Sequence, residues 1–431
     1  MPRIARHSLP TVLTVVLATL SACGGDPDDA PGTTRLEVWA HAGQPGERAT
    51  LESQVERFNA RQDSIRVEVE FLPEGSYHAQ LQASAIAGQL PDLVDLDGPY
   101  VALLAWQGHL RPLTGLLPDS LLADVLPSIR EQGTWRDELW ALGTFDSGLG
   151  LYARRSALES AGARIPASPD AAWTVAELDA LLADLSAADP DGAVLDLKLG
   201  YEGEWFAYAF QPALRSAGGG LMRAGANGHE ARGVLDGPES AGALDVLQRW
   251  IAGGRVDPNL DDAAFVSGRV PLSWSGHWDH PAYADALGDD LVLVPLPDFG
   301  EGTRTGQGSW VWGVAADTDR EREAATFLAF LLEPDEVLAM TASNGAVPGT
   351  RSAADRSDLY GPGGPLDLLR RQLEEGWATP RPRTPAYPFV SSVFQDVFEA
   401  LRNGEPLGPV LDEAAATIDR EVDDNRGYPG S

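Results

Sequence analysis

The sequence of 431 residues predicts an α/β protein that is divided into two lobes. Short strands and segments with helical spacing alternate from residue 36 onward, and this order is typical of sheets with parallel strands. About 400 residues follow the leader segment described below, which is more than one small core accommodates. A hydrophobic content of 43% and twelve Trp residues indicate well-packed cores.

The opening residues set the order of strands and helices. Residues 36–39 alternate in hydrophobicity and predict a strand, whereas residues 46–61 carry apolar side chains at helical spacing. Residues 65–71 (IRVEVEF) alternate strictly, which is typical of a half-buried strand. A helix is predicted over residues 77–87, and a short apolar strand that ends in acids is predicted over residues 91–97.

The same order continues later in the chain. Residues 173–185 predict a helix that begins with a capping box, since Glu177 follows Thr174 by three residues. Another helix is predicted over residues 206–214. Residues 323–332 predict a further helix, and Pro334 starts the one after it. Two segments rich in Gly or Pro predict loops, residues 361–365 and 379–388.

The N-terminus has the pattern of a secretory signal. Two arginines precede an apolar run over residues 9–20, which is too short to span a bilayer as a stable helix. The run ends in LSAC, which resembles a bacterial lipobox, and Cys23 is the only cysteine of the chain. An ordinary signal peptide with an incidental cysteine is the alternative. We expect a signal peptide over residues 1–22 and a lipid on Cys23.

Residues 23–34 are then expected to form the lipidated cysteine and a flexible tether. After the cysteine they read GGDPDDAPGTT, with no large apolar side chain to anchor them in a core. A flexible chain of this length has an end-to-end distance of about 18 Å, enough to hold a domain off a membrane surface. The formal charge of −32 excludes nucleic acid as a partner, because phosphate binding needs a basic surface.

Several motifs, taken in order, carry a resemblance to a known family. They are residues 36–71, 88–97 (GQLPDLVDLD), 140–162 (WALGTFDSGLGLYARRSALESAG), 214–222 (LRSAGGGLM), 264–278 (AFVSGRVPLSWSGHW), 295–337 and 344–353 (NGAVPGTRSA). In this order the chain resembles the extracellular solute-binding proteins related to maltose-binding protein. It departs from the family pattern at Ala153, Arg269 and Pro271, which are structural positions.

The resemblance implies a periplasmic-binding-protein-like type II fold, in which a hinge joins two α/β lobes and the ligand lies in the cleft between them. Lobe 1 would hold residues 35–145 and 297–345, and lobe 2 residues 146–296 and 346–431. The implied function is that of the substrate-binding lipoprotein of an ABC importer. It would capture a carbohydrate outside the cytoplasm and deliver it to the permease transmembrane subunits. We expect a monomer without a cofactor, a metal site or enzymatic activity.

A sugar needs carboxylates or amides for its hydroxyls and flat rings for its C–H faces. Loops that follow strands supply both kinds of side chain, and ligands of α/β sheets bind there. The candidate ligand-binding residues are Trp39, His41, Gln44, Asp97, Tyr100, Asp146, Glu204, Trp205, Trp274, Trp278, Trp310, Arg383 and Tyr387.

In the first lobe, some candidates have a structural alternative. Trp39 lies inside a strand and could belong to the core. Asp97 lies closer to the loop than Asp95, for which a helix cap is the alternative. Asp146 falls where the chain enters the second lobe, at a place where acids of the family often meet the sugar. Trp310 lies in a glycine-rich loop, whereas Trp312 is expected in the core.

In the second lobe, residues 201–208 form the densest cluster of acids and rings. Glu204 and Trp205 are preferred within it, with Tyr208 as the rival. Trp278 matches the family tryptophan that stacks on sugar. The candidates Arg383 and Tyr387 belong to the late Pro-rich loop and could equally be surface residues.

Three alternatives stay open at this point. A secreted glycoside hydrolase would use Asp146 and Glu204 as its two carboxylates. A metal site would use His277 and His280, which lack a third ligand nearby. A binding protein for another solute, such as a polyamine, would also suit an acidic cleft.

Overall fold

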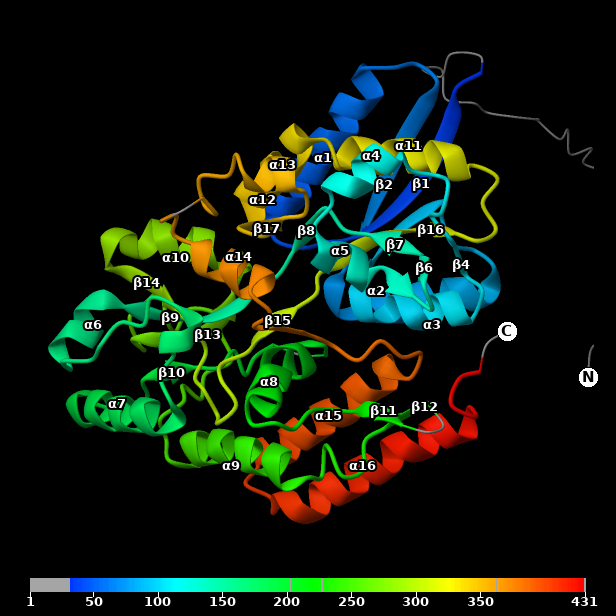
Figure 1. The fold of residues 1–431 in the computed structure, drawn as a ribbon. Helices are drawn as coiled ribbons and strands as arrows, with labels where there is room; N and C mark the ends of the chain where they lie inside the picture. The colour runs from blue at the N-terminus through cyan, green and yellow to red at the C-terminus, as the bar shows by residue number, and fades with distance from the viewer. Residues whose placement is uncertain (1–31, 202, 226–227, 362, 430–431) are drawn as a thin grey trace, which may run out of the picture.

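The computed structural model describes residues 32–201, 203–225, 228–361 and 363–429. Its ribbon has two lobes of strands and helices, one above the other in Figure 1, with several segments running between them. The predicted signal peptide, Cys23 and most of the tether lie outside the described residues.

The first lobe is built on a sheet of strand order β2-β1-β3-β16-β4, with β7 also paired to β16. These strands are β1 (Thr34–His41), β2 (Ile65–Leu72), β3 (Leu93–Asp97), β4 (Leu110–Arg111), β7 (Ala141–Leu142) and β16 (Trp310–Ala315). β1 runs parallel to both β2 and β3, as the opening pattern predicts. β16 returns antiparallel to β3 and places Trp310 opposite Asp97.

Helices cover both faces of this sheet, so two cores form. On one face, Val38 packs with apolar residues of α1 (Pro45–Ala60) and α11 (Glu321–Leu331). On the other face, Leu96 packs with α2 (Glu74–Ala87) and α3 (Val101–Trp106). α12 (Pro334–Asn344) packs beside α1. Every residue of β3 is buried, including its two aspartates, as expected for a strand covered on both faces.

The second lobe is built on a sheet of order β10-β13-β9-β14. Its strands are β9 (Leu149–Arg154), β10 (Leu195–Asp196), β13 (Leu272–Gly276) and β14 (Leu291–Val294). Its helices are α6 (Arg155–Ser160), α7 (Val175–Ala188), α8 (Trp205–Ser216), α9 (Pro238–Ala252), α10 (His280–Leu287), α15 (Tyr387–Arg402) and α16 (Leu407–Asp424). Phe398 of α15 stacks on Phe206 and Phe210 of α8 and so fixes the C-terminal helices to this core.

Short strand pairs connect the two lobes, and we call them the crossing strands. β8 (Phe145–Asp146) pairs antiparallel with β17 (Val347–Pro348). β15 (Thr305–Gln307) pairs parallel with β18 (Ala378–Pro380). The hydroxyl of Thr305 also exchanges hydrogen bonds with the backbone of Leu149, at 2.7 and 2.8 Å. The connection between the lobes is therefore a small set of paired strands.

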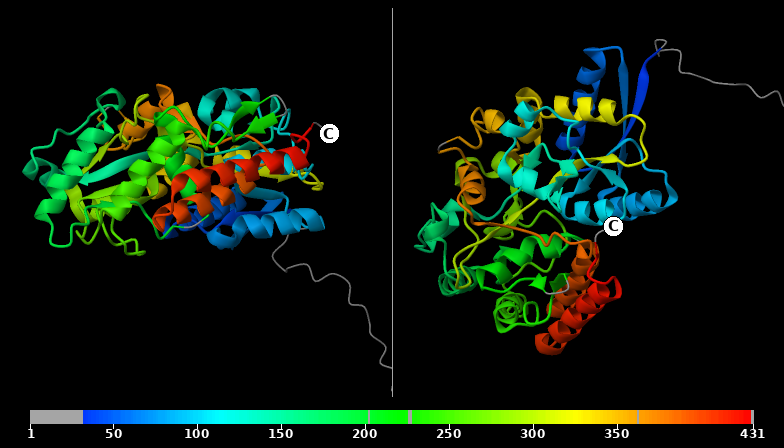
Figure 2. Two further views of the ribbon diagram at one scale, coloured as in Figure 1. Left: turned by 90° about the horizontal axis from the view of Figure 1, so that it is seen from below. Right: turned by 45° about the vertical axis from the view of Figure 1, so that its right-hand side comes forward.

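The remaining elements are short. They are α4 (Asp119–Asp124), α5 (Pro127–Gln132), α13 (Arg351–Ala354) and α14 (Asp367–Glu374), the hairpins β5 (Thr134–Trp135) with β6 (Glu138–Leu139) and β11 (Arg223–Gly225) with β12 (Gly228–Glu230), and the turns η1 (Gly98–Tyr100), η2 (Pro169–Ala171), η3 (His277–Asp279) and η4 (Gly288–Asp290). Figure 2 shows α15 and α16 side by side along one edge of the second lobe.

Packing does not follow the predicted boundary after residue 345. Tyr360, Leu366 and Leu369 are buried in the core that contains Val38 and α1, on the side of the first lobe. The hydroxyl of Tyr360 donates to the carbonyl of Gly345. The division of the chain into lobe residues therefore stays a prediction. Buried residues between 346 and 369 pack against the first lobe instead of the second.

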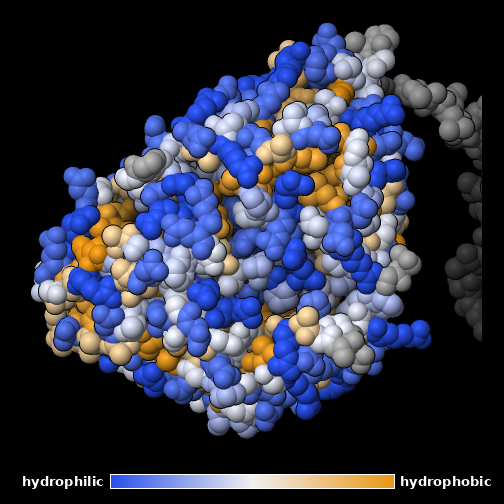
Figure 3. All heavy atoms as spheres, viewed as in Figure 1, coloured by the Kyte–Doolittle hydropathy of each residue, from blue (hydrophilic) through white to orange (hydrophobic). Residues whose placement is uncertain are grey.

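Most predicted elements are confirmed within a few residues, and one part of the late loop is wrong. Tyr387 starts helix α15 instead of lying in a loop, and residues 378–380 form β18. Pro388 at the second helical position is compatible with that start. In the described part of the chain, no helix is both long and apolar enough to cross a membrane. Hydrophilic side chains cover much of the face in Figure 3, in keeping with the charge of −32.

The capping box at α7 is confirmed. The hydroxyl of Thr174 accepts from the Glu177 amide at 3.2 Å, and the Thr174 amide donates to the Glu177 carboxylate at 2.8 Å. Replacing Thr174 by Ala should lower the unfolding free energy by about 1 kcal/mol, because a helix-terminal amide loses its partner. Equilibrium urea unfolding measures this. Thr326→Ala, within α11, is the matched control and should change it by less than about 0.5 kcal/mol. Equal effects of the two changes would contradict a capping role.

Candidate functional site

The guanidinium of Arg381 lies between carboxylates from the two lobes. Its terminal nitrogens donate to the two oxygens of Asp97, at 2.7 and 2.6 Å, and one of them also donates to Glu204 at 2.7 Å. Only 5% of Arg381 and 7% of Asp97 is exposed. Bidentate, charge-assisted hydrogen bonds of this kind are among the strongest that proteins make. We call these three residues the interlobe triad.

The crossing strands hold Arg381 in this position. Pro380 ends β18, where it pairs with Gln307 of β15, and its carbonyl accepts from the Gln211 side chain at 2.8 Å. Gly308, the residue that follows β15, has a φ of 116°, and a Cβ there would lie 3.0 Å from an Arg381 nitrogen. A glycine is therefore needed where the guanidinium passes the backbone.

Both carboxylate oxygens of Glu204 accept hydrogen bonds from side chains of α15 or of the segment that follows β18. One carboxylate oxygen accepts from Arg381 and from the hydroxyl of Tyr387, and the other accepts from Ser391 at 2.6 Å. Burial raises the pKa of Glu204 above its ordinary value, and the positive charge of Arg381 opposes this rise. The predicted candidates Glu204 and Tyr387 thus lie in one cluster.

In the first lobe, four flat rings form a continuous stack. His41 lies 3.7 Å from Trp310, Trp310 lies 5.2 Å from His78, and His78 lies 3.8 Å from Tyr100, measured between ring centroids. Neighbouring rings are inclined by 7°, 14° and 17°. Because β1 and β3 are parallel and β16 is antiparallel to β3, His41, Asp97 and Trp310 meet at one edge of the sheet. The predicted loops of the first lobe therefore converge.

His41 carries a positive charge in this stack. Its Nδ1 lies 2.7 Å from a carboxylate oxygen of Asp95, and its backbone amide donates to the other oxygen at 3.1 Å. Burial lowers the pKa of His41, but the charge and hydrogen bond of Asp95 outweigh burial and raise the pKa to about 9. The imidazolium therefore lies on the face of Trp310, a favourable cation–π arrangement. Asp95 is a partner of this histidine and not a helix cap.

In the second lobe, Trp278 is a half-buried ring in the turn η3. Its ring centroid lies 5.9 Å from that of Trp205 and 6.1 Å from that of Tyr208. A Cβ at Gly276 would lie 2.1 Å from the Trp278 ring, so the absence of a side chain there makes room for it. The Arg381 guanidinium lies 4.9 Å above Tyr208, which links this group of rings to the interlobe triad.

Asp146 is part of the connection between the lobes, with no exposed surface. One carboxylate oxygen accepts from the amides of Ser147, at 2.7 Å, and Gly308, at 3.2 Å. Burial raises its pKa, and these hydrogen bonds oppose the rise. Because the residue lies in β8 and accepts from the residue that follows β15, it joins two of the crossing strands, and its contact with the solute stays a prediction.

Five other candidates lie away from the triad or in a core. Trp274 is fully buried against Phe210, because its strand is covered on both faces, and Trp205 is buried with its indole N–H bound to the carbonyl of Leu197. The others are Trp39, which packs beside the α2 and α3 core, Gln44, which is exposed before α1, and Arg383, which is exposed and bound to Glu131. Trp312 is a core residue, as predicted.

Arg381, His78 and Tyr208 belong to this cluster but are not among the predicted candidates, and Tyr208 is the named rival of Glu204 and Trp205. Arg381 stands two residues before the candidate Arg383 in a repeated Pro-Arg pattern, and of the two arginines it is Arg381 that lies in the interlobe triad. The pairing of β15 with β18 determines which of the two arginines lies between the acids, and this pairing cannot be read from a single sequence. His78 had no signal beyond its place beside Tyr77.

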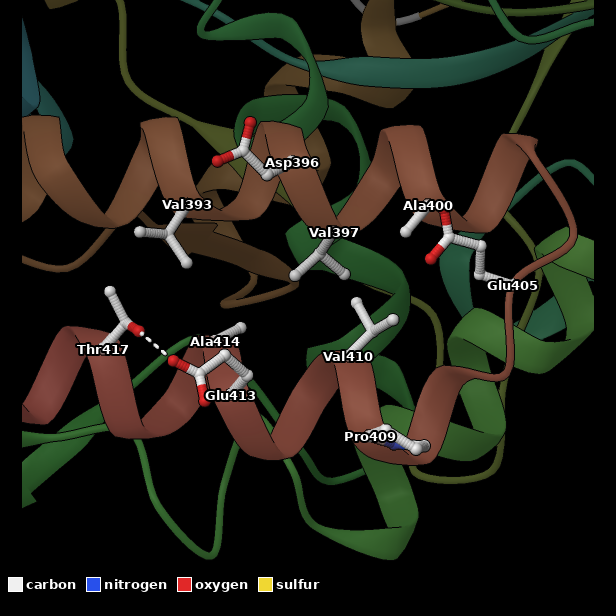
Figure 4. Close-up of a pocket in the computed structure, with 10 residues that line it drawn as sticks. All are labelled: Val393, Asp396, Val397, Ala400, Glu405, Pro409, Val410, Glu413, Ala414 and Thr417. Atoms are coloured by element: carbon white, nitrogen blue, oxygen red, sulfur yellow. Dashed lines mark hydrogen bonds between the residues drawn. The ribbon is translucent and has the colours of Figure 1, made fainter.

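Two surface hollows lie elsewhere and contain none of the candidates. One, of about 450 Å³, lies between α15 and α16 and is lined by Val and Ala side chains with acids at its rim (Figure 4). The other, of about 710 Å³, lies between α1, α4 and α11. Among the described residues, no group of three His, Cys, Asp or Glu could hold a metal ion. His277 instead binds the carbonyl of Asn344 at 2.8 Å.

Comparisons with known proteins relate most of the chain to one class. A family profile described as bacterial extracellular solute-binding protein matches residues 53–360. An uncharacterized lipoprotein from the oleD 5′ region of Streptomyces antibioticus is 27% identical over 377 residues, which is 81% of this chain and 78% of that protein.

Solved structures agree with that relation. The cyclic alpha-maltosyl-1,6-maltose binding protein from Arthrobacter globiformis is 25% identical, with a TM-score of 0.74 over 91% of this chain and 100% of that one. The GacH receptor of Streptomyces glaucescens, 21% identical, has a TM-score of 0.76 over 91% of this chain and 98% of that one, which shows the shared fold. The expected two-lobe type II fold is therefore confirmed.

The His41–Asp95 pair should make stability depend on pH. The pKa of His41 is about 9 in the folded protein, against about 6.5 in an unfolded chain. Its stabilising contribution is therefore complete below pH 6.5 and is lost as the pH rises through 9. The loss of unfolding free energy caused by His41→Gln should shrink between pH 6 and pH 9.5, as urea unfolding would measure. In an Asp95→Asn background the same comparison is the control, and it should show little pH dependence. A pH-independent effect in both backgrounds would contradict the assignment.

Proposed function

This chain belongs to the bacterial extracellular solute-binding proteins, and we propose that its solute is a carbohydrate captured between the two lobes. Membership of this family makes it a transport protein that acts outside the cytoplasm, not an enzyme. We further propose that it delivers the solute to the transmembrane subunits of an ABC importer. Family membership therefore argues against the alternative in which Asp146 and Glu204 are the two carboxylates of a glycoside hydrolase.

The observation that carries the carbohydrate proposal is the meeting of acids and flat rings where the two lobes join. Asp97 from the first lobe and Glu204 from the second lie on the same guanidinium. Carboxylates accept hydrogen bonds from sugar hydroxyls, and rings stack on the C–H faces of a sugar. The relative from Arthrobacter globiformis is by its name a binding protein for a maltose-containing sugar, which supports the same class of solute.

We propose that the solute contacts come from both lobes. The first lobe would contribute Asp97, Tyr100 and Trp310, and the second would contribute Trp278 and Glu204. A solute that touches both lobes stabilises their closed arrangement, and the difference in its affinity for the open and closed states sets the shift in population. The crossing strands would bend to admit it, because the triad joins the two lobes at this junction.

The lipid anchor and the monomeric state belong to the same proposal. The Streptomyces antibioticus relative is called a lipoprotein, which supports lipidation of Cys23. A tether of the length of residues 24–34 would let the lobes stand clear of the membrane.

A screen of mono-, di- and oligosaccharides should find a sugar that raises the melting temperature and quenches Trp fluorescence. Trp278→Ala should weaken that sugar's affinity by roughly tenfold or more, about 1.4 kcal/mol, because a stacking ring is lost. Isothermal titration calorimetry measures this. Trp135→Ala is the matched control, since Trp135 is also half-buried but packs on Trp140 in a hairpin of the first lobe. An unchanged affinity in Trp278→Ala would remove this ring from the site, and a panel without any binding sugar would refute the carbohydrate proposal.

Replacing Cys23 by Ser should release the protein from the membrane fraction and abolish its labelling by radioactive palmitate, because no thiol remains to be lipidated. The purified soluble protein should keep the sugar affinity of the native one. Membrane association that survives the change would contradict the anchor.

A further inference from the structure

We propose that Arg381 sets the charge class of the solute. Its guanidinium occupies the cation position between Asp97 and Glu204, so the junction accepts an uncharged polyol, and removal of the guanidinium leaves a site for an organic cation. The inference rests on the proposed capture of a solute between the lobes, and it adds a residue that decides between a sugar and a polyamine.

The first argument is the charge at the junction. Asp97 and Glu204 bring two carboxylates to one point, and Arg381 is the one arginine or lysine bonded to either of them among the described residues. The positive charge of His41 is bound to Asp95 instead. Without the guanidinium, two buried carboxylates would face each other uncompensated, which is costly.

The second argument is the set of rings around this position. The guanidinium lies 4.9 Å above the ring of Tyr208, and the hydroxyl of Tyr387 bonds to the same Glu204 oxygen that accepts from Arg381. Carboxylates together with aromatic faces are the surroundings in which proteins hold organic cations. The position therefore has the chemistry of a cation site, and the chain fills it with its own side chain.

The third argument is what Arg381 leaves available. Each Asp97 oxygen accepts one hydrogen bond from the guanidinium, and a carboxylate oxygen has a second lone pair for a hydroxyl. The Nε of Arg381 has no hydrogen-bond partner, although it is buried. A neutral polyol can therefore add hydrogen bonds to the neutralised acids, whereas a cationic solute would be repelled by the guanidinium.

The segment that follows β18 contains a second arginine, which can be compared with Arg381. Arg383, two residues later, is exposed and pairs with Glu131 at the surface of the first lobe. Both arginines connect the same segment to the first lobe, but only Arg381 lies between acids of the two lobes. If Arg381 merely clamped the segment, losing either side chain would have effects of the same kind.

The test uses the whole mature protein, calorimetric titration and thermal melting, with methylguanidinium, agmatine and spermidine as cationic probes and the best sugar of the panel as the neutral probe. Arg381→Ala should bind methylguanidinium or agmatine at least tenfold more tightly than the native protein does, and should bind the sugar at least tenfold more weakly. Adding methylguanidinium should restore part of the sugar affinity. Arg383→Ala should leave both affinities as they are in the native protein.

Two further variants keep the result interpretable if Arg381→Ala folds poorly. Arg381→Lys retains a positive charge and should bind the sugar without gaining affinity for the cations. Arg381→Ala with Glu204→Gln retains one carboxylate, so it should fold more stably and bind the cations with an affinity between those of Arg381→Ala and the native protein. Arg381 variants that gain no cation binding overturn the inference. Failure of the native protein to bind any sugar would instead refute the proposed function, while the cation titrations would still decide the role of Arg381.

Discussion

The arrangement of the two lobes depends on one buried group of charges. Arg381 neutralises Asp97 and Glu204, which come from different lobes and would otherwise be expensive to remove from water. The crossing strands β15 and β18 place the arginine, and Gly308 gives it room to pass. Ser391 and Tyr387 of α15 also donate hydrogen bonds to Glu204. These contacts join three parts of the chain at one point: the C-terminal helices, the residues that follow β18 and the edge of the first sheet.

The rings on either side of this point owe their places to different parts of the chain. In the first lobe, the mixed directions of β1, β3 and β16 bring residues that are about 270 positions apart to the same sheet edge, where His41 and Trp310 stack. In the second lobe, Trp278 lies in a turn beyond the end of β13, beside a glycine that has no side chain. The proposed sugar would therefore meet flat rings from both lobes beside acids whose charge is balanced by Arg381.

Much of the fold could be predicted from the sequence because its signals are local. Strict alternation in residues 65–71 and the spacing of Thr174 and Glu177 report backbone structure directly, and both are confirmed. The site was harder to predict because it depends on pairing between distant segments. Trp274 and Trp278 look equivalent in sequence, yet one points from a covered strand into the core and the other lies in a turn. Strand register likewise places Arg381, and not Arg383, between the two acids, and Asp146 joins crossing strands through a hydrogen bond that its sequence position does not reveal.

The crossing strands also limit how the molecule can move. A single covalent connection would leave one half free to swivel in any direction about the other. Here two pairs of strands make the connection, and each pair is held by backbone hydrogen bonds. A hydrogen bond from Gly308 to Asp146 joins one pair to the other. Such a connection resists twisting and sliding of the lobes more than it resists bending. Opening should therefore be a hinge rotation about one axis. Each closure then returns the same side chains of one lobe to the same residues of the other lobe.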